Sequence, residues 1–168
     1  MKKLVILFVC CIIGISVCYA QKNDRKASFK SWENYEITTV KVGVEGTKFV
    51  KVWGYGKNVD AAIMSAKKNA VHACIFRGLP ANTNVNATPA LLDESTYMNN
   101  YEYFEKFFAP GGAYLGFVNM TTDGIPTGQD RLKVKGGYKV ALYIQVMFDN
   151  LKNKLEQDGL KKKLSAGF

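Results

Sequence analysis

The spacing of hydrophobic and polar residues changes several times along the chain, and each change marks a predicted element of structure. Residues 36–56 alternate between apolar and polar side chains and contain many β-branched residues, which predicts a β-hairpin. The turn is expected at Glu45-Gly46, where the glycine can supply the positive φ of a tight connection.

A helix is predicted from Val59 to Arg77, with Asn58 as its N-terminal cap and Gly78 directly after its end. Small or apolar side chains recur in it every three or four positions. Many of them are alanines, at Ala62, Ala66, Ala70 and Ala73. An alanine-lined face needs a flat and close neighbour, so we expect this helix to pack on the sheet that the preceding hairpin begins.

The stretch from Ala81 to Asn100 has no sustained period, and its asparagine, threonine and proline content predicts a long loop. Loops of this length are often functional, although a flexible connection without a role is the alternative. An aromatic-rich segment over residues 97–108 predicts a short helix that ends before Pro110.

Two further strands are predicted over residues 113–120 and 131–148, the second with a bulge or bend at Gly136-Gly137. A last helix is expected from residue 149 or 150 to about Leu164. The order β-β-α-loop-α-β-β-α predicts one α+β domain over residues 32–168. Its antiparallel sheet is built from two hairpins, with helices packed on one face.

The first twenty residues have the pattern of an export signal. Two lysines precede the apolar stretch 4–17, and Cys18-Tyr19-Ala20 places small side chains before a cleavage site at Gln21. We therefore expect a signal peptide over 1–20, a flexible lead-in over 21–31, and a periplasmic or secreted protein. An uncleaved membrane anchor is one alternative. A lipid anchor at Cys18 is another, although the preceding valine is bulky for that role.

The chain is basic, with 23 lysine and arginine residues against 14 aspartate and glutamate residues and a formal net charge of +9. Only two of these lysines lie in the predicted signal peptide, so the mature form stays basic. Such a charge suits anionic partners, such as lipid headgroups, envelope polymers or acidic proteins, and export argues against nucleic acid. The alternative is that the charge serves only solubility.

Cysteine and histidine restrict the possible chemistry. Three of the four cysteines lie in the export segment, so the mature chain would keep only Cys74, which we expect to be buried as a small apolar side chain. The one histidine, His72, is two residues away and would point elsewhere on the helix, so we expect a surface histidine. We therefore expect no metal, no cofactor, and no nucleophile paired with a histidine base.

Two groups of side chains are candidates for binding a partner. The first consists of aromatic residues of the segment 97–108, namely Tyr97, Tyr101, Tyr103 and Phe107. The second is basic and lies near the end of the chain, at Lys161, Lys162 and Lys163. Core packing is the alternative for the aromatic group, and a solvated helix end is the alternative for the lysines.

Paired carboxylates suggest a different function. Acidic residues lie in the long loop and in the aromatic helix, at Asp93, Glu94, Glu102 and Glu105. Two of them could act as the acid and the base of a small secreted glycan hydrolase. Their spacing is not diagnostic, and solvated helix faces are the alternative.

The segment 49–56, Phe-Val-Lys-Val-Trp-Gly-Tyr-Gly, leads into Asp60-Ala61-Ala62, the alanine-spaced stretch 66–71 and Gly78. This pattern resembles bacterial envelope domains, the LPP20-like lipoproteins and the N-terminal domain of the flagellar assembly protein T. The resemblance covers about thirty residues, 49–78, and implies a small α+β envelope domain that serves as an assembly or scaffold component without catalytic residues. The long insertion and the absence of a lipid-attachment motif depart from the lipoprotein pattern.

Together these observations lead us to expect a non-enzymatic exported envelope protein. It would bind a partner protein or an anionic envelope polymer through exposed aromatic and basic side chains.

Overall fold

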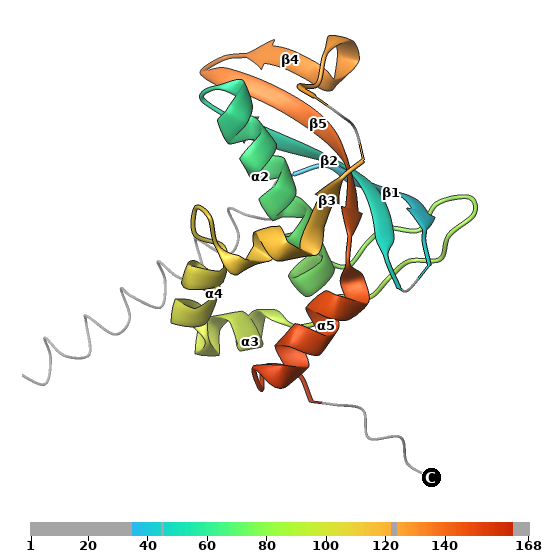
Figure 1. Ribbon diagram of the computed structural model, residues 1–168, viewed down its shortest axis with the longest axis vertical. Helices are drawn as coiled ribbons and strands as arrows, with labels where there is room; N and C mark the ends of the chain where they lie inside the picture. Colours follow the sequence, from blue (N-terminus) through green and yellow to red (C-terminus); the bar gives the residue numbers. More distant parts are fainter. Residues whose placement is uncertain (1–34, 45, 122–123, 163–168) are drawn as a thin grey trace, which may run out of the picture.

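The computed structural model describes residues 35–44, 46–121 and 124–162 (Figure 1). Its main elements are β1 (Ile37–Val42), β2 (Lys48–Gly56), α2 (Val59–His72), α3 (Glu94–Asn99), α4 (Tyr101–Phe107), β3 (Val118–Met120), β4 (Arg131–Val134), β5 (Gly137–Val146) and α5 (Phe148–Gln157). A π-helical turn, Ala73–Arg77, continues α2, and 3₁₀ turns at Ala113–Phe117 and Gly128–Asp130 precede β3 and β4. The predicted signal peptide and lead-in lie outside the described residues.

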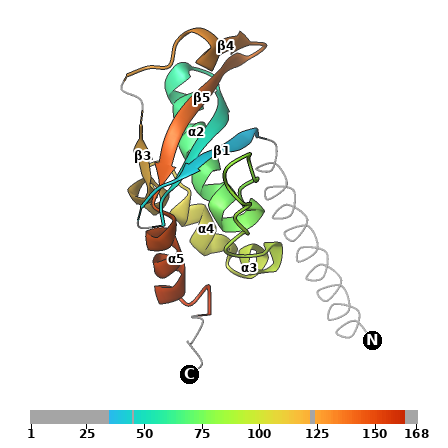
Figure 2. The same cartoon turned by 90° about the vertical axis from the view of Figure 1, so that its right-hand side faces the viewer.

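The strands form one antiparallel sheet in the order β1-β2-β5-β3, and β4 also pairs with β5. The short strands β3 and β4 pair with opposite ends of β5. In Figures 1 and 2, α2 lies against the sheet, and α3, α4 and α5 gather at the end of the molecule opposite the β4–β5 turn. The predicted α+β class and the antiparallel sheet are confirmed.

The alanine-lined helix packs on the sheet as expected. Asn58 caps α2, its side-chain oxygen accepting a hydrogen bond of 2.8 Å from the Ala61 amide. The side chains of Ala62 and Ala66 are fully buried. On β2, Gly54 leaves room for the helix, because a Cβ at this glycine would lie 2.2 Å from the Ala62 carbonyl oxygen.

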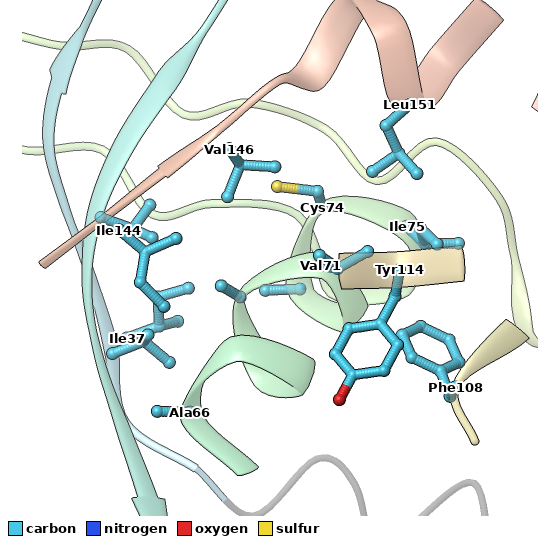
Figure 3. Packing of buried hydrophobic residues seen from close by; sticks show 14 of the residues in the cluster. Ile37, Ala66, Val71, Cys74, Ile75, Phe108, Tyr114, Ile144, Val146 and Leu151 are labelled. Atoms are coloured by element: carbon cyan, nitrogen blue, oxygen red, sulfur yellow. The ribbon is translucent and has the colours of Figure 1, made fainter. Parts of the chain in front are cut away.

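The core continues beyond the sheet around the π-helical turn (Figure 3). Cys74 is fully buried there, as expected, and burial raises the pKa of its thiol to about 12. Tyr114 and Phe108 pack beside the same turn, and Leu151 of α5 covers it from another side. The helices at this end therefore share one hydrophobic core with the sheet.

The expected position of His72 on the surface is wrong, because this side chain is only 1% exposed. The sheet covers one side of α2, and the rings of Tyr35, Phe76 and Phe108 cover the other, with centroids 5.2 to 6.1 Å from the imidazole. The Tyr35 hydroxyl lies 3.0 Å from Nδ1 of the histidine, within hydrogen-bond distance. Burial, together with the positive charges of Lys68 and Arg77, lowers the pKa of His72 to about 3.

Part of the predicted loop 81–100 has regular backbone structure. Antiparallel bridges join Leu79 to Thr88 and Asn82 to Val85, and α3 begins at residue 94. The loop runs along the outer edge of β1, where the Asn82 amide nitrogen donates hydrogen bonds of 2.7 and 3.1 Å to the carbonyl oxygens of Thr39 and Val40.

The predicted aromatic helix over residues 97–108 is two helices, α3 and α4, that meet at Asn100. The Asn100 side chain donates a hydrogen bond of 2.9 Å to the Thr96 carbonyl oxygen. Asparagine side chains compete in this way with the backbone hydrogen bonds of a helix, which accounts for the break.

Two strand predictions need correction. The first half of the segment 113–120 is a 3₁₀ turn, and only its last three residues form a strand. The segment 131–148 is a hairpin, β4 and β5, instead of one bent strand, because Gly136 has a φ of 88° and reverses the chain.

The last helix ends earlier than expected, at Gln157, where Gly159 with a φ of 74° terminates it.

Candidate functional site

The aromatic segment that was a candidate binding surface belongs mostly to the core. Tyr97 is fully buried and Phe107 is 4% exposed. The prediction that these two side chains are exposed for binding is therefore wrong. The Tyr97 ring stacks on Phe104 with centroids 5.7 Å apart, and Phe104 packs edge-on against Phe76 at 4.9 Å. These rings are buried because they cover the far side of the helix formed by α2 and its π-helical turn.

The other two aromatic candidates are half-buried. Tyr101 packs edge-on against Tyr97, with centroids 5.7 Å apart. The Tyr103 hydroxyl donates a hydrogen bond of 2.5 Å to the carboxylate of Asp158, which also accepts one of 2.6 Å from Lys154. Desolvation and the neighbouring carboxylate raise the pKa of Tyr103. This tyrosine therefore ties α4 to the end of α5.

The structure describes two of the three lysines in the basic group near the end of the chain. The Lys161 ammonium donates a hydrogen bond of 2.9 Å to the Leu91 carbonyl oxygen and so holds the chain end against the long loop. Lys162 is exposed, and Lys163 lies outside the described residues.

The four candidate carboxylates are exposed. Asp93 caps α3, accepting a hydrogen bond of 2.7 Å from the Thr96 amide, and this bond with those from the Thr96 and Ser95 side chains lowers its pKa to about 2. Glu94, Glu102 and Glu105 lie on the surfaces of α3 and α4. None of the four lines the cavities beside Pro80, beside Phe49 or between β1 and the loop 84–88.

The face of the sheet turned away from α2 carries a second set of aromatic and basic side chains, and among the described residues no α-helix covers it (Figures 1 and 2). We call this set the aromatic–lysine face. It consists of Lys41 on β1, Phe49, Lys51, Trp53 and Tyr55 on β2, and Lys139 and Tyr143 on β5. The intervening positions of β2, Val50, Val52 and Gly54, are fully or largely buried beneath α2.

The lysines of this face lie over its rings. Lys139 Nζ is 4.5 Å from the centroid of Trp53 and 5.5 Å from that of Tyr55. Lys51 Nζ is 5.1 Å from the centroid of Tyr143 and 5.8 Å from that of Trp53. Such cation–π contacts fix the lysines in place and bring positive charge onto an aromatic surface.

Two carboxylates hold these lysines from the sides. Lys139 pairs with Glu36 at 2.6 Å, and Lys51 pairs with Asp130 at 2.7 Å. In both cases the hydrogen bond to the carboxylate is the main cause of a raised lysine pKa, so both ammonium groups stay charged at neutral pH. The ion pairs orient the two lysines along the face.

The third lysine of the face, Lys41, borders two cavities. Its Nζ lies 4.7 Å from the Phe49 ring centroid. A cavity of about 220 Å³ opens beside this ring, with Tyr143 and Thr121 among its other walls. A second cavity of about 530 Å³, between the edge of β1 and the loop 84–88, also has Lys41 in its lining.

Exposed apolar side chains extend the face towards the β4–β5 turn. Leu132 is 43% exposed and pairs directly with Lys139, and Val134 is 36% exposed and pairs with Gly137. Residues directly opposite each other in a ladder share a face of the sheet, so both belong beside Tyr55, which is itself 46% exposed.

Sequence reasoning missed this face although its signal is present. In the alternating strand 49–56, the positions opposite the core side are aromatic or lysine, where an ordinary solvated face would carry smaller polar residues. The same holds for Lys139 and Tyr143 in β5. The strand pattern therefore contained the face, but the segment 97–108 is denser in aromatic residues and gives the stronger signal.

Among the described residues, no three histidine, cysteine, aspartate or glutamate side chains gather closely enough to hold a metal ion. Within the same ranges, no helix combines the length and the hydropathy of a membrane span. Comparison with models of known protein families, with curated proteins and with solved structures found no significant match to this chain.

Proposed function

We propose that this protein is a non-enzymatic exported component of the cell envelope, and that its aromatic–lysine face binds an anionic polysaccharide of that envelope. The observation that carries the proposal is the alternation of rings and ammonium groups on an open sheet face. Trp53, with Lys139 on one side and Lys51 on the other, is the centre of this arrangement.

The chemistry of the face suits acidic sugars. Aromatic rings offer flat apolar surfaces on which sugar rings stack, and their polar edges tolerate water. Ammonium groups make charge-assisted hydrogen bonds to carboxylates or phosphates. Because rings and charges alternate, one chain of acidic sugar units can use both kinds of contact at once.

The shape of the face suits a polymer better than a compact ligand. From Phe49 to Tyr55 the row on β2 covers six residue steps, about 20 Å at the usual rise of a strand. Small molecules are usually enclosed in concave pockets, whereas this row extends along a strand that no α-helix among the described residues covers on this side. A polymer can follow the row and gain affinity from several weak contacts.

The resemblance of residues 49–78 to envelope domains supports the same location. In the pattern Val52-Trp53-Gly54-Tyr55-Gly56, the glycines face α2 and the two aromatic residues face outwards. One strand therefore serves both as the seat of the helix and as the centre of the proposed binding face. An acidic partner protein could use the same contacts, and the experiment below separates the two partners.

The test measures binding of the purified protein to polygalacturonate, a polymer of acidic sugar units, and to dextran, a neutral glucan, by isothermal titration calorimetry. We expect polygalacturonate to bind and dextran to bind at least tenfold more weakly. We also expect affinity to fall as salt is added, since exposed charges are screened.

Two double variants locate the site. Trp53→Ala with Tyr55→Ala should weaken polygalacturonate binding by about tenfold or more, which corresponds to about 1.4 kcal/mol. Lys106→Gln with Lys162→Gln removes two exposed charges away from the face and should leave the affinity within about twofold. Equal binding by wild type and the aromatic variant would refute the proposed site. Absence of binding to any acidic glycan, together with capture of an acidic protein, would favour the protein partner.

A further inference from the structure

We infer that the cavity between Phe49 and Tyr143 is a subsite for a single acidic sugar ring, and that Lys41 determines its specificity by pairing with the carboxylate of that ring. This inference rests on the proposed function and names the chemical class that its ligand must contain. It predicts a preference for uronic acids over their neutral esters.

The three lysines of the aromatic–lysine face differ in their charge partners. Lys51 and Lys139 are held by Asp130 and Glu36, so part of their charge is already neutralised. Among the described residues, Lys41 forms no ion pair, and its contact on this face is the Phe49 ring. An incoming carboxylate therefore gains more from Lys41 than from the other two.

The cavity has the size and the walls for one ring. Its volume of about 220 Å³ is below the range of about 300–1,000 Å³ that is typical of pockets for drug-sized ligands. Phe49 on β2 and Tyr143 on β5 supply apolar and aromatic surface. They are diagonal neighbours on paired strands, because Tyr143 pairs directly with Lys51. The Thr121 hydroxyl donates a hydrogen bond of 3.0 Å to the Tyr143 carbonyl oxygen, which leaves its oxygen able to accept one from a sugar hydroxyl.

The second cavity provides a path for the rest of the polymer. It shares Val40 and Lys41 with the first cavity, so the two adjoin at this lysine. Its lining also includes Lys48, Asn84 and Asn86, which offer one further ammonium group and two amides that can bond sugar hydroxyls. A bulge in β1 between Thr39 and Lys41 places Val40 and Lys41 at the junction.

The experiment compares trigalacturonate with its methyl ester, which has the same rings without the charge, by titration calorimetry against the purified protein. We expect the acid to bind at least tenfold more tightly than the ester. Lys41→Gln should reduce this preference to about twofold or less, and Lys41→Arg should restore most of it. Lys106→Gln is the matched control and should leave the preference unchanged.

The outcomes separate this inference from the proposed function. If Lys41→Gln keeps the full preference for the acid while Trp53→Ala with Tyr55→Ala abolishes binding, the subsite is refuted and the proposed face stands. If wild type binds neither trigalacturonate nor polygalacturonate, both proposals fail. Lys41 is exposed, so its variants should keep the wild-type thermal midpoint. A lowered midpoint with affinity restored by Lys41→Arg would still support the charge pairing.

Discussion

The helix α2 packs closely on β2 at Gly54, so Gly54→Ala is the most informative single substitution for testing this packing. The added Cβ would lie 2.2 Å from the Ala62 carbonyl oxygen, 2.3 Å from the Ala66 amide nitrogen and 2.8 Å from the Ala66 Cα. All three are backbone atoms of the helix, so no side-chain rotation can relieve the contact. Ordinary carbon contacts need at least about 3.5 Å. The helix must therefore move outwards by roughly 1 Å, and the fully buried alanines lose contact with the sheet.

The expected cost follows from two opposing terms. Overpacking a core costs typically about 1–3 kcal/mol and occasionally more, and this contact lies at the upper end because it involves rigid backbone on both sides. Replacing a strand glycine by alanine returns about 0.5–1 kcal/mol through the unfolded state. We expect the free energy of unfolding to fall by about 2–3 kcal/mol, and the thermal midpoint by about 5–10 °C for a chain of this size.

Urea unfolding followed by circular dichroism measures this change. Gly116→Ala is the matched control, because a Cβ at Gly116 would meet no heavy atom within 4 Å. We expect the control to stay within about 0.5 kcal/mol of the wild type. If Gly54→Ala also stayed within that range, the helix could not sit as closely on the sheet as described.

Two further predictions concern polar side chains, one buried and one half-buried. The pKa of His72 is lowered to about 3 in the folded protein against 6.5 for the free side chain, so its contribution to stability is complete above pH 6.5 and is lost as the pH falls towards 3. Between pH 7.5 and pH 5 we expect protonation of this histidine in the unfolded state to reduce the free energy of unfolding by about 2 kcal/mol. Urea titrations at several pH values measure this dependence on pH, and His72→Phe should remove it. A variant with the same slope as the wild type would disprove the assignment. Tyr103→Phe deletes the hydrogen bond to Asp158 and should cost about 1 kcal/mol of stability, discounted for its partial exposure. Measuring the same loss in an Asp158→Ala background, which has no acceptor for the tyrosine hydroxyl, would show that the bond is not the cause.

Much of the fold could be predicted because its strongest signals are local. The recurrence of alanine at 62, 66 and 70 defines the face of α2 that meets the sheet, and the cap at Asn58 defines where the helix begins. The hairpin over residues 36–56 follows from alternation alone. These patterns depend on neighbours within a few residues, so one chain is sufficient to find them.

The errors arose where distant segments decide burial. His72 lies away from the alanine face of its helix, and it is buried only because Tyr35 and Phe108 approach from far along the chain. Likewise, the many aromatic residues of the segment 97–108 are compatible either with burial in the core or with an exposed binding surface. The packing of Phe76 on Phe104, far apart in sequence, decides that this segment is core.

For the candidate site, the sequence groups the residues on one strand face but does not show whether that face is covered. Alternation predicts that Phe49, Lys51, Trp53 and Tyr55 share one face of a strand, but it does not say which face a helix covers. That choice depends on where α2 returns after Gly56, and the paired glycines of β2 settle it by admitting the helix on their own side. Only the assembled sheet then brings Lys139 and Tyr143 beside the β2 row.

The hydrogen bonds between the loop after α2 and the outer edge of β1 have a consequence for self-association. A free edge strand is a template on which a second molecule can add its own strand, and this is a common route to aggregation. Here the Asn82 amide occupies the carbonyl oxygens of Thr39 and Val40, and the Thr39 hydroxyl is bound to the Pro80 carbonyl oxygen. The loop 81–93 thus blocks the addition of a second molecule's strand at this part of the β1 edge.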